Sequence, residues 1–294
     1  MNSTVKKILK WVGILLLVWI VGSLALLKYI GAWSVFFPSH AHETVAPEIP
    51  ASVELPAILV FTKTNSFRHK EAIEAGAVFF EQLAQAQGWS MFHTENGAVF
   101  NAEDLSRFAV VIFHNASGDI LSQEQQLAFQ TWLQDGGGWL GVHAAGDGSH
   151  QDWPWYVENL LGAKFTAHPM DPQYQVADVT NEMPDHPVMT GLPKNWQHEE
   201  EWYSWERSPR GKDFTILVSI DEQSYSPIQK ILGAENDLRM GDHPVVWNRC
   251  IGEGRAIYSA LGHQAKAYED SKHKQLLENA ITWAMDTQVC KGNP

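Results

Sequence analysis

Five histidines stand at or just after apolar runs that are typical of buried strands. They are His69 after NSFR, His114 ending AVVIFH, His143 ending GWLGVH, His168 ending KFTAH and His263 ending AIYSALGH. Parallel strands in an open sheet bring their carboxyl ends to one edge, where ligands bind, so at least four of the five are expected to converge. Imidazole titrates near neutral pH and binds metals. The pattern therefore predicts a site for proton transfer or metal binding, although any single histidine could instead be a hydrogen-bonded structural residue.

An acidic cluster, HEEEWYSW at 198–205, is the second concentration of reactive groups. On an extended segment alternate side chains share a face, which places Glu199, Glu201 and Tyr203 on one side and Glu200 and Trp202 on the other. One face could supply a carboxylate and a phenol to the histidine cleft. The alternative is a solvated sheet edge.

These two patterns define the predicted site residues. His143 is expected to act as general base or metal ligand, with Glu201 as its acid–base partner. A divalent metal such as Zn²⁺ fits imidazole and carboxylate ligands, but no short motif fixes it. The predicted ligand-binding residues are His69, His114, Asp147, His168, Tyr203 and His263, and the predicted metal ligands are His69, His143, His168 and His263.

Two partner classes are disfavoured. Gly136, Gly138 and Gly141 match G-x-G-x-x-G, but they follow a predicted helix and enter a strand, the reverse of the dinucleotide-binding order, so no nucleotide cofactor is expected. A net charge of −13 repels phosphate backbones, so no nucleic-acid partner is expected.

The elements that must position these residues alternate along the chain. Apolar runs at 58–62, 89–93, 109–114 and 138–143 are separated by helical spacing at 70–87 and by a helix that Ser122 opens. This order predicts an α/β protein with a mostly parallel sheet and helices on both faces. After residue 150 strand-like runs dominate and predict a mixed or antiparallel extension, closed by a helix at 270–286.

The N-terminus predicts a membrane segment. Residues 11–30 are almost uncharged and long enough to cross a bilayer. Lys6, Lys7 and Lys10 precede them, so the positive-inside rule places residues 1–10 in the cytoplasm and the main domain in the periplasm or outside the cell. A cleaved signal peptide, cut near Ser39-His40-Ala41, is the alternative. Residues 31–56 are expected to form a Pro-rich extended linker.

Two cysteines, Cys250 and Cys290, could pair in an oxidising compartment or remain unlinked thiols.

Several stretches together resemble the trehalose-utilisation, or ThuA-like, family. They include SFRH (66–69), GGGWLGVHAAGD (136–147), DHPVMTGLP (185–193), EEWY (200–203) and HPVVWNRCIGEGRAIYSALGH (243–263). The resemblance is collinear over about residues 57–286, which become the predicted domain, with 287–294 as a tail. It implies a flavodoxin-like, class I glutamine amidotransferase-like three-layer sandwich whose mostly parallel sheet is extended by extra strands.

The resemblance also bears on activity. In the amidotransferases a nucleophilic cysteine occupies the turn where this chain has His143, so glutaminase chemistry is not expected. The family implies a carbohydrate or keto-sugar ligand in disaccharide metabolism, with a sugar dehydrogenase as partner. The reaction, whether lyase, isomerase or hydrolase, stays open. The alternatives are a non-catalytic carbohydrate-binding module and a structural domain held in a membrane complex.

Overall fold

The computed structural model describes residues 2–29, 33–211, 213–231, 233–288 and 290. Residue 30 of the predicted membrane helix, residues 31 and 32 of the predicted linker, and residues 289 and 291–294 of the predicted tail lie outside this range.

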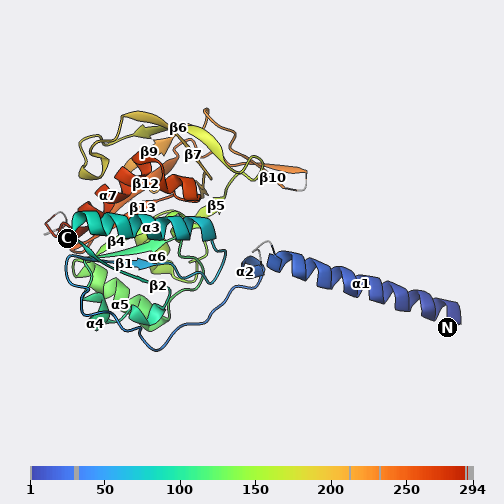
Figure 1. Ribbon diagram of the computed structural model, residues 1–294. Helices are drawn as coiled ribbons and strands as arrows, with labels where there is room; N and C mark the ends of the chain where they lie inside the picture. The colour runs from blue at the N-terminus through green and yellow to red at the C-terminus, as the bar shows by residue number, and fades with distance from the viewer. Residues whose placement is uncertain (1, 30–32, 212, 232, 289, 291–294) are drawn as a thin grey trace.

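A twisted mixed sheet forms the centre of the domain (Figure 1). Within the described residues it has nine strands, and the five on one side are mutually parallel, whereas the rest pair antiparallel. In spatial order the strands are β2 (Ser90–Thr94), β1 (Ala57–Phe61), β3 (Val110–His114), β4 (Gly138–Val142), β13 (Gly254–Ser259), β12 (Pro244–Ile251), β9 (Thr215–Ile220), β6 (Gln175–Asn181) and β7 (Asn195–Glu200). The predicted mostly parallel sheet with an antiparallel extension is confirmed.

Helices cover both faces of the parallel half and complete a three-layer sandwich. Phe113 on β3 packs against Phe129 of α5, whereas the next residue, His114, packs against Phe80 of α3. Successive side chains of a strand point to opposite faces, so α3 and α5 lie on opposite sides of the sheet. The long helices are α3 (Lys70–Gln87), α5 (Gln123–Gln134) and α7 (Ser271–Met285), the last packing with α3 around the short helix η5 (Ala265–Tyr268).

Local sequence signals explain where these helices begin and end. Ser122 accepts a hydrogen bond from the backbone N–H of Gln125, and the Gln125 side chain accepts one from the backbone of Ser122, which forms a capping box at the start of α5. Gly88 ends α3 with a φ of 70°, a conformation that glycine adopts without steric cost. The glycines after α5 turn the chain into β4, and Gly138 lies so close to the backbone of Ala284 that a Cβ would clash.

Shorter elements complete the chain. Two small two-stranded sheets lie outside the main one, β5 (Phe165–Ala167) with β8 (Ser204–Trp205) and β10 (Ile228–Ile231) with β11 (Ala234–Asp237). The remaining short helices are η1 (Gly97–Val99), α4 (Ala102–Leu105), η2 (His143–Gly146), α6 (Pro154–Tyr156), η3 (Val157–Leu161) and η4 (Pro187–Met189).

The N-terminal helix α1 (Ser3–Tyr29) projects away from the domain (Figure 1). Its length and its mean hydropathy of 2.2 suffice to cross a membrane, and the same properties suit a signal sequence. A four-residue helix, α2 (Trp33–Phe36), follows it and lies beside the domain.

The Pro-rich segment after α2 has no helix or strand among residues 37–56, and it is attached to the domain rather than free. Lys63 donates to the carbonyl of Ala41 and forms an ion pair with Glu43, and Asn65 also donates to the Ala41 carbonyl. Further along, Arg107 donates to three backbone carbonyls, and Ile49 is buried in the core. The sequence could not predict most of these contacts, because the hydrogen-bond acceptors are backbone carbonyls of the segment, which every residue type carries.

Cys250 and Cys290 form a disulfide, which resolves the alternative that the sequence left open. It ties β12 to the chain that follows α7.

Candidate functional site

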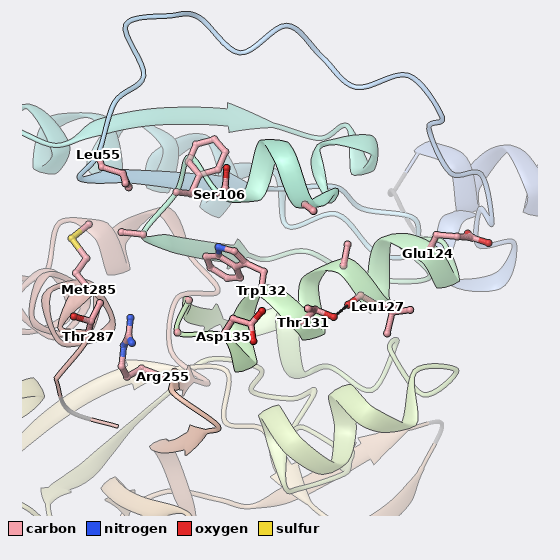
Figure 2. Close-up of a pocket in the computed structure, with 16 residues that line it drawn as sticks. Leu55, Ser106, Glu124, Leu127, Thr131, Trp132, Asp135, Arg255, Met285 and Thr287 are labelled. Atoms are coloured by element: carbon pink, nitrogen blue, oxygen red, sulfur yellow. Dashed lines mark hydrogen bonds between the residues drawn. The ribbon is translucent and has the colours of Figure 1, made fainter. Parts of the chain in front are cut away.

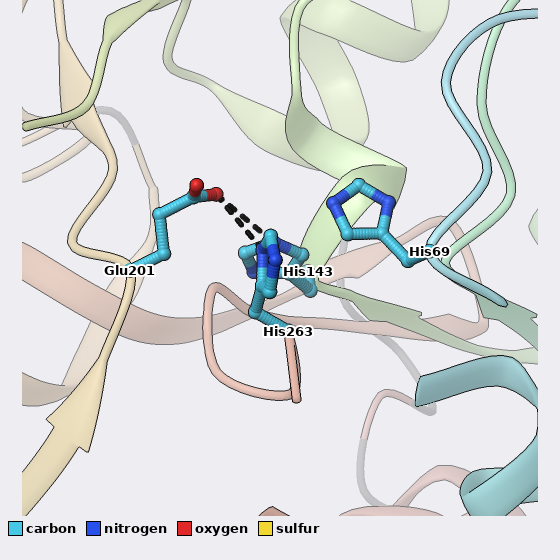
Figure 3. Close-up of side chains that lie close together, drawn as sticks. All are labelled: His69, His143, Glu201 and His263. Carbon is cyan, nitrogen blue, oxygen red and sulfur yellow. Dashed lines mark hydrogen bonds and ion pairs between the residues drawn. The ribbon is translucent and has the colours of Figure 1, made fainter. Parts of the chain in front are cut away.

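Four side chains meet at the carboxyl edge of the parallel strands (Figure 3). His69 lies in the loop after β1, His143 directly follows β4, and His263 follows β13. Glu201 follows β7 at the far end of the extended sheet in strand order. The fold thus brings together residues that are up to 194 positions apart in the sequence. The convergence at one sheet edge is the arrangement that the histidine spacing predicted.

The three imidazoles contact one another at close range. Their ring centroids are 4.5 to 4.9 Å apart in the three pairings, each close to perpendicular. His143 Nε2 lies 2.9 Å from His263 Nδ1. One ligand atom from each of the three histidines and from Glu201 can be chosen so that all lie within 4.8 Å of one another.

Glu201 is the acidic member of the group and is almost fully buried. One carboxylate oxygen lies 3.0 Å from His263 Nδ1 and 3.4 Å from His143 Nε2. The other lies 3.1 Å from His168 Nδ1 and accepts a hydrogen bond from the Gln173 amide. The carboxylate is therefore held from both sides.

The backbone conformation at His143 and its hydrogen bonds fix the orientation of the imidazole ring. Its φ of 49° lies in the left-handed region that residues with a side chain rarely occupy. Tyr258 donates to the His143 carbonyl at 2.8 Å, and His143 Nδ1 donates to the carbonyl of Ala260 at 2.8 Å. With Nδ1 committed to a carbonyl, Nε2 is the nitrogen that faces Tyr203, Glu201 and the other rings.

Glu200, the neighbour of Glu201, points to the opposite side and holds the backbone of the site. It is fully buried and accepts hydrogen bonds from the backbone N–H groups of Gly262, His263 and Glu201. The pKa of Glu200 is about 2, because hydrogen bonds and the charges of nearby histidines outweigh the effect of burial. Glu201 and Tyr203 line the cavity, on the face that the alternation assigned to them. Glu199, expected on the same face, is instead exposed and pairs with Lys266, and Glu200 and Trp202 on the other face are buried.

Charge interactions shift the pKa values of the buried groups in different directions. Burial alone would lower the pKa of His143, but the carboxylates of Glu201 and Glu200 raise it above its ordinary value. Burial would raise the pKa of Glu201, yet hydrogen bonds with His143 and His263 hold it far below the usual range. Burial and the neighbouring imidazoles lower the pKa of His69 well below its ordinary value. At neutral pH the site therefore contains an ionised carboxylate, a His143 ring that retains protons readily and a neutral His69.

The donor set fits a divalent metal ion. Three imidazoles and one carboxylate are the ligands that Zn²⁺ uses in proteins, with bonds of about 2.0–2.1 Å. Two ligand nitrogens 2.9 Å apart can both reach one ion at that bond length. His69 Nδ1 is buried and has no hydrogen-bond partner among the described residues, which leaves a lone pair or proton without a role. The Ala260 carbonyl and the Tyr174 hydroxyl, which contacts His263 Nε2 at 2.9 Å, are outer contacts of the kind that orient ligand histidines.

A cavity of about 490 Å³ opens onto this group. Of the predicted site residues, His69, Asp147, His168, Glu201, Tyr203 and His263 line it. His143 is fully buried and lies behind this lining, in contact with Tyr203 and His263.

Two predicted residues differ from expectation. His114 lies outside the cavity lining, and its Nε2 hydrogen-bonds to the Tyr268 hydroxyl on the α3 face of the sheet. It belongs to β3 itself, where the alternation of side chains turns it away, whereas His143 stands one residue beyond its strand. His168 follows β5, which is outside the main sheet, and it contacts Glu201 instead of joining the four-residue group.

Three residues of the site were not anticipated from the sequence. Tyr174 and Gln173 reach His263 and Glu201 from a loop before β6, and Glu200 had been placed on the face opposite Glu201. The loop residues belong to no motif. Glu200 could have been suspected from its place beside a predicted catalytic carboxylate.

A larger cavity, of about 710 Å³, lies at the opposite edge of the sheet (Figure 2). It is lined by residues that precede β1, β3 and β4, by Arg255 at the start of β13 and by apolar side chains such as Leu127 and Trp132. No histidine lines it, so it lacks the convergent groups of the four-residue site.

Comparisons with known proteins agree with this architecture. The family model described as ThuA, trehalose utilisation, matches residues 57–284. A solved structure described as a ThuA-like protein from Bacteroides uniformis is 28% identical, covers 82% of this chain and 95% of its own, and has a TM-score of 0.67. No curated protein matches the chain.

More distant structures share the fold alone. A ThuA-like protein from Parabacteroides merdae is 19% identical over 78% of this chain and 90% of its own, with a TM-score of 0.60. A cytoplasmic protein from Salmonella typhimurium is 10% identical over 78% of this chain and 99% of its own, with a TM-score of 0.51.

Proposed function

The chain belongs to the ThuA, or trehalose-utilisation, family, and from that premise we propose that it acts on a carbohydrate or keto-sugar by acid–base chemistry of His143 and Glu201. One observation carries the proposal. Three imidazoles and a buried carboxylate from four separate segments converge at a cavity of about 490 Å³, with His143 directly behind its lining, and this volume is in the range of small-molecule sites.

His143 is the proposed proton carrier. Its Nδ1 is occupied by the Ala260 carbonyl, so Nε2 is the atom that takes or gives a proton. Ionised Glu201 stabilises the protonated ring at 3.4 Å, and the Tyr203 hydroxyl lies 2.9 Å from the same nitrogen. A proton removed from a sugar carbon or hydroxyl would therefore have an acceptor already oriented by buried neighbours.

A divalent metal is proposed to bind to His69, His143, Glu201 and His263. When bound, such an ion would polarise a carbonyl or hydroxyl oxygen of the sugar. His168 and Gln173 would hold Glu201 in place on its other oxygen. His143 and Glu201 then both serve as ligands, and the hydroxyls of Tyr174 and Tyr203 remain as the groups near the reacting atoms.

The cavity wall suits a sugar. Phe67, Phe165 and Tyr203 offer aromatic surface to the apolar face of a ring, and Asp147 and His168 offer polar atoms to hydroxyls. A sugar dehydrogenase is the proposed partner, because oxidation of a disaccharide would supply the keto-sugar.

Membrane attachment through α1 is proposed on its length, its apolarity and the lysines before it. This places the N-terminus in the cytoplasm and the domain in the periplasm or outside the cell. Protease digestion of intact and of opened cells tests it, because a domain that is digested in closed cells is external, and one that is protected contradicts the proposed topology.

The test of activity uses the full-length protein in detergent, stripped with a chelator and dialysed. Metal content and melting temperature are measured before and after Zn²⁺ is returned, and products from trehalose and a 3-keto disaccharide are followed by NMR. Turnover that His143→Ala abolishes supports the enzyme. Sugar binding without turnover, with an affinity that His143→Ala leaves unchanged, supports the carbohydrate-binding module instead.

A further inference from the structure

The cavity lies beside the segment that links it to the proposed membrane helix. Val35 of α2 lines the cavity together with Ser66 and Phe67, which belong to the loop after β1. A few residues later the backbone N–H of Ser39 donates to the Asn65 carbonyl at 2.8 Å, which hydrogen-bonds the linker to the domain. The chain therefore reaches the domain at the rim of the site, not at a remote surface.

This attachment is held by several contacts. His40 and His42 both hydrogen-bond to Asp119 in the loop after β3, at 3.1 and 2.9 Å. Lys63, at the carboxyl end of β1, is paired with Glu43 at 2.7 Å. All of these partners belong to the carboxyl edge of the sheet, so the linker attaches there first. It reaches the amino edge only later in the chain, where Arg107 donates to carbonyls of residues 49–53.

The free length before this attachment is short. Ten peptide units separate Tyr29, the last described residue of α1, from Ser39. Fully extended they span at most about 35 Å. A domain of about 230 residues has a radius of gyration of about 17 Å, and hence a diameter of about 45 Å. A helix that crosses the membrane would thus keep the attached edge closer to the bilayer than the opposite edge.

The surface between helix and cavity suits the bilayer boundary. Residues 29–39 carry no charged side chain, and Trp33, Val35, Phe36 and Phe37 are all exposed. Met170, which also lines the cavity, is 46% exposed. Tryptophan and other large apolar residues of this kind favour the membrane–water interface.

We infer that the histidine cavity opens toward the membrane and takes its sugar from a membrane-borne amphiphile, a glycolipid whose apolar chains stay in the bilayer. The sugar would reach the floor at His69 and Glu201, while the chains pass Val35 and Met170. This rests on the proposed anchoring and sugar binding, and it adds the orientation of the site and the class of its substrate.

The orientation is tested with the full-length chain in phosphatidylcholine vesicles. Met170→Cys and, independently, Val35→Cys are labelled with bimane, and quenching by a lipid with a nitroxide on its headgroup is measured. Leu55→Cys, 62% exposed and just before β1 at the opposite edge, is the control. We expect at least threefold stronger quenching at the two rim positions. Equal quenching at all three positions, or a purified chain whose mass shows that residues 1–41 have been removed, overturns the inference.

The substrate class is tested on the same labelled protein by iodide quenching. Glucosyl diacylglycerol in the vesicles should protect the rim label from iodide, and free trehalose at the same sugar concentration should protect it less. Protection by trehalose alone overturns the membrane-borne substrate and leaves sugar binding intact. If neither sugar protects the label, both the membrane-borne substrate and sugar binding are overturned. The nitroxide quenching then still decides the orientation of the cavity.

Discussion

The two edges of the parallel sheet carry cavities of opposite character. The amino edge has the larger one, about 710 Å³, with mainly apolar walls (Figure 2), and the carboxyl edge has the smaller one, about 490 Å³, with buried imidazoles and a carboxylate at its floor. Volume alone would select the wrong edge. The difference follows from topology, because loops that leave parallel strands at their carboxyl ends can bring residues from distant segments together.

The strongest test of this contrast removes the carboxylate. Glu201→Gln keeps the shape of the side chain but removes the charge that pairs with His143 and His263. We expect Zn²⁺ affinity to fall at least about 100-fold, the upper end of what outer contacts contribute, since Glu201 is itself a proposed ligand. Isothermal titration calorimetry measures the change.

Glu199→Gln is the matched control for that variant. Glu199 lies two residues away, is exposed and pairs with Lys266. The Zn²⁺ affinity of this variant should match that of the unmodified chain. An equal loss of affinity in both variants would contradict the role of Glu201 as a metal ligand.

The second test is pH. Glu201 and Glu200 raise the pKa of His143 above its ordinary value, so the ring holds a proton that a metal must displace. Metal affinity should therefore fall as pH decreases from 8 to 6, by about tenfold per pH unit for each proton displaced. Titration calorimetry in buffers of different ionisation enthalpy counts the protons released, and an affinity that is constant across this range would contradict the proposed ligands.

Removal of the disulfide tests whether the stability of the domain and metal binding at the site are independent. Its cysteines are 40 residues apart, and closing a loop of that length contributes about 4 kcal/mol in the chain-entropy account. Cys250→Ser with Cys290→Ser should lower the free energy of unfolding by up to that amount in urea denaturation. Zn²⁺ affinity at 25 °C should change less than threefold, because neither cysteine contacts the four-residue group; a larger change would link the two regions.

The smallest effect is expected at the amino edge. Ala128→Leu adds volume to the larger cavity, at a half-buried position of α5. Sugar and Zn²⁺ binding should stay within twofold of the unmodified chain. A loss of either would mean that the apolar cavity, too, contributes to function.

Much of the fold followed from local patterns that act within a few residues. The helical spacing at 70–87 coincides with α3, and the apolar runs at 58–62 and 109–114 fall on β1 and β3. These succeed because buried parallel strands are continuous in apolar residues and because caps such as Ser122 act on neighbouring backbone groups.

The site was predictable to the extent that the sheet edge gathers its residues. His69, His143 and His263 follow parallel strands and meet, and Glu201 joins them. The prediction for His114 was wrong because the alternation of side chains along β3 turns it away from the cavity. Tyr174 was not predicted because a loop has no periodic pattern. The pairing of the cysteines depended on how α7 returns to β12, which no local pattern encodes.

The attachment of the Pro-rich segment has a consequence for maturation. The peptide bond after Ala41, the candidate cleavage point, lies beside a carbonyl that accepts from both Lys63 and Asn65. A protease binds its substrate as a free extended segment, so we expect removal of the leader to occur during export, before the domain folds. Once the domain has folded, these two hydrogen bonds hold the exposed scissile position against the loop after β1, so we expect a chain that was not cut early to resist cleavage there.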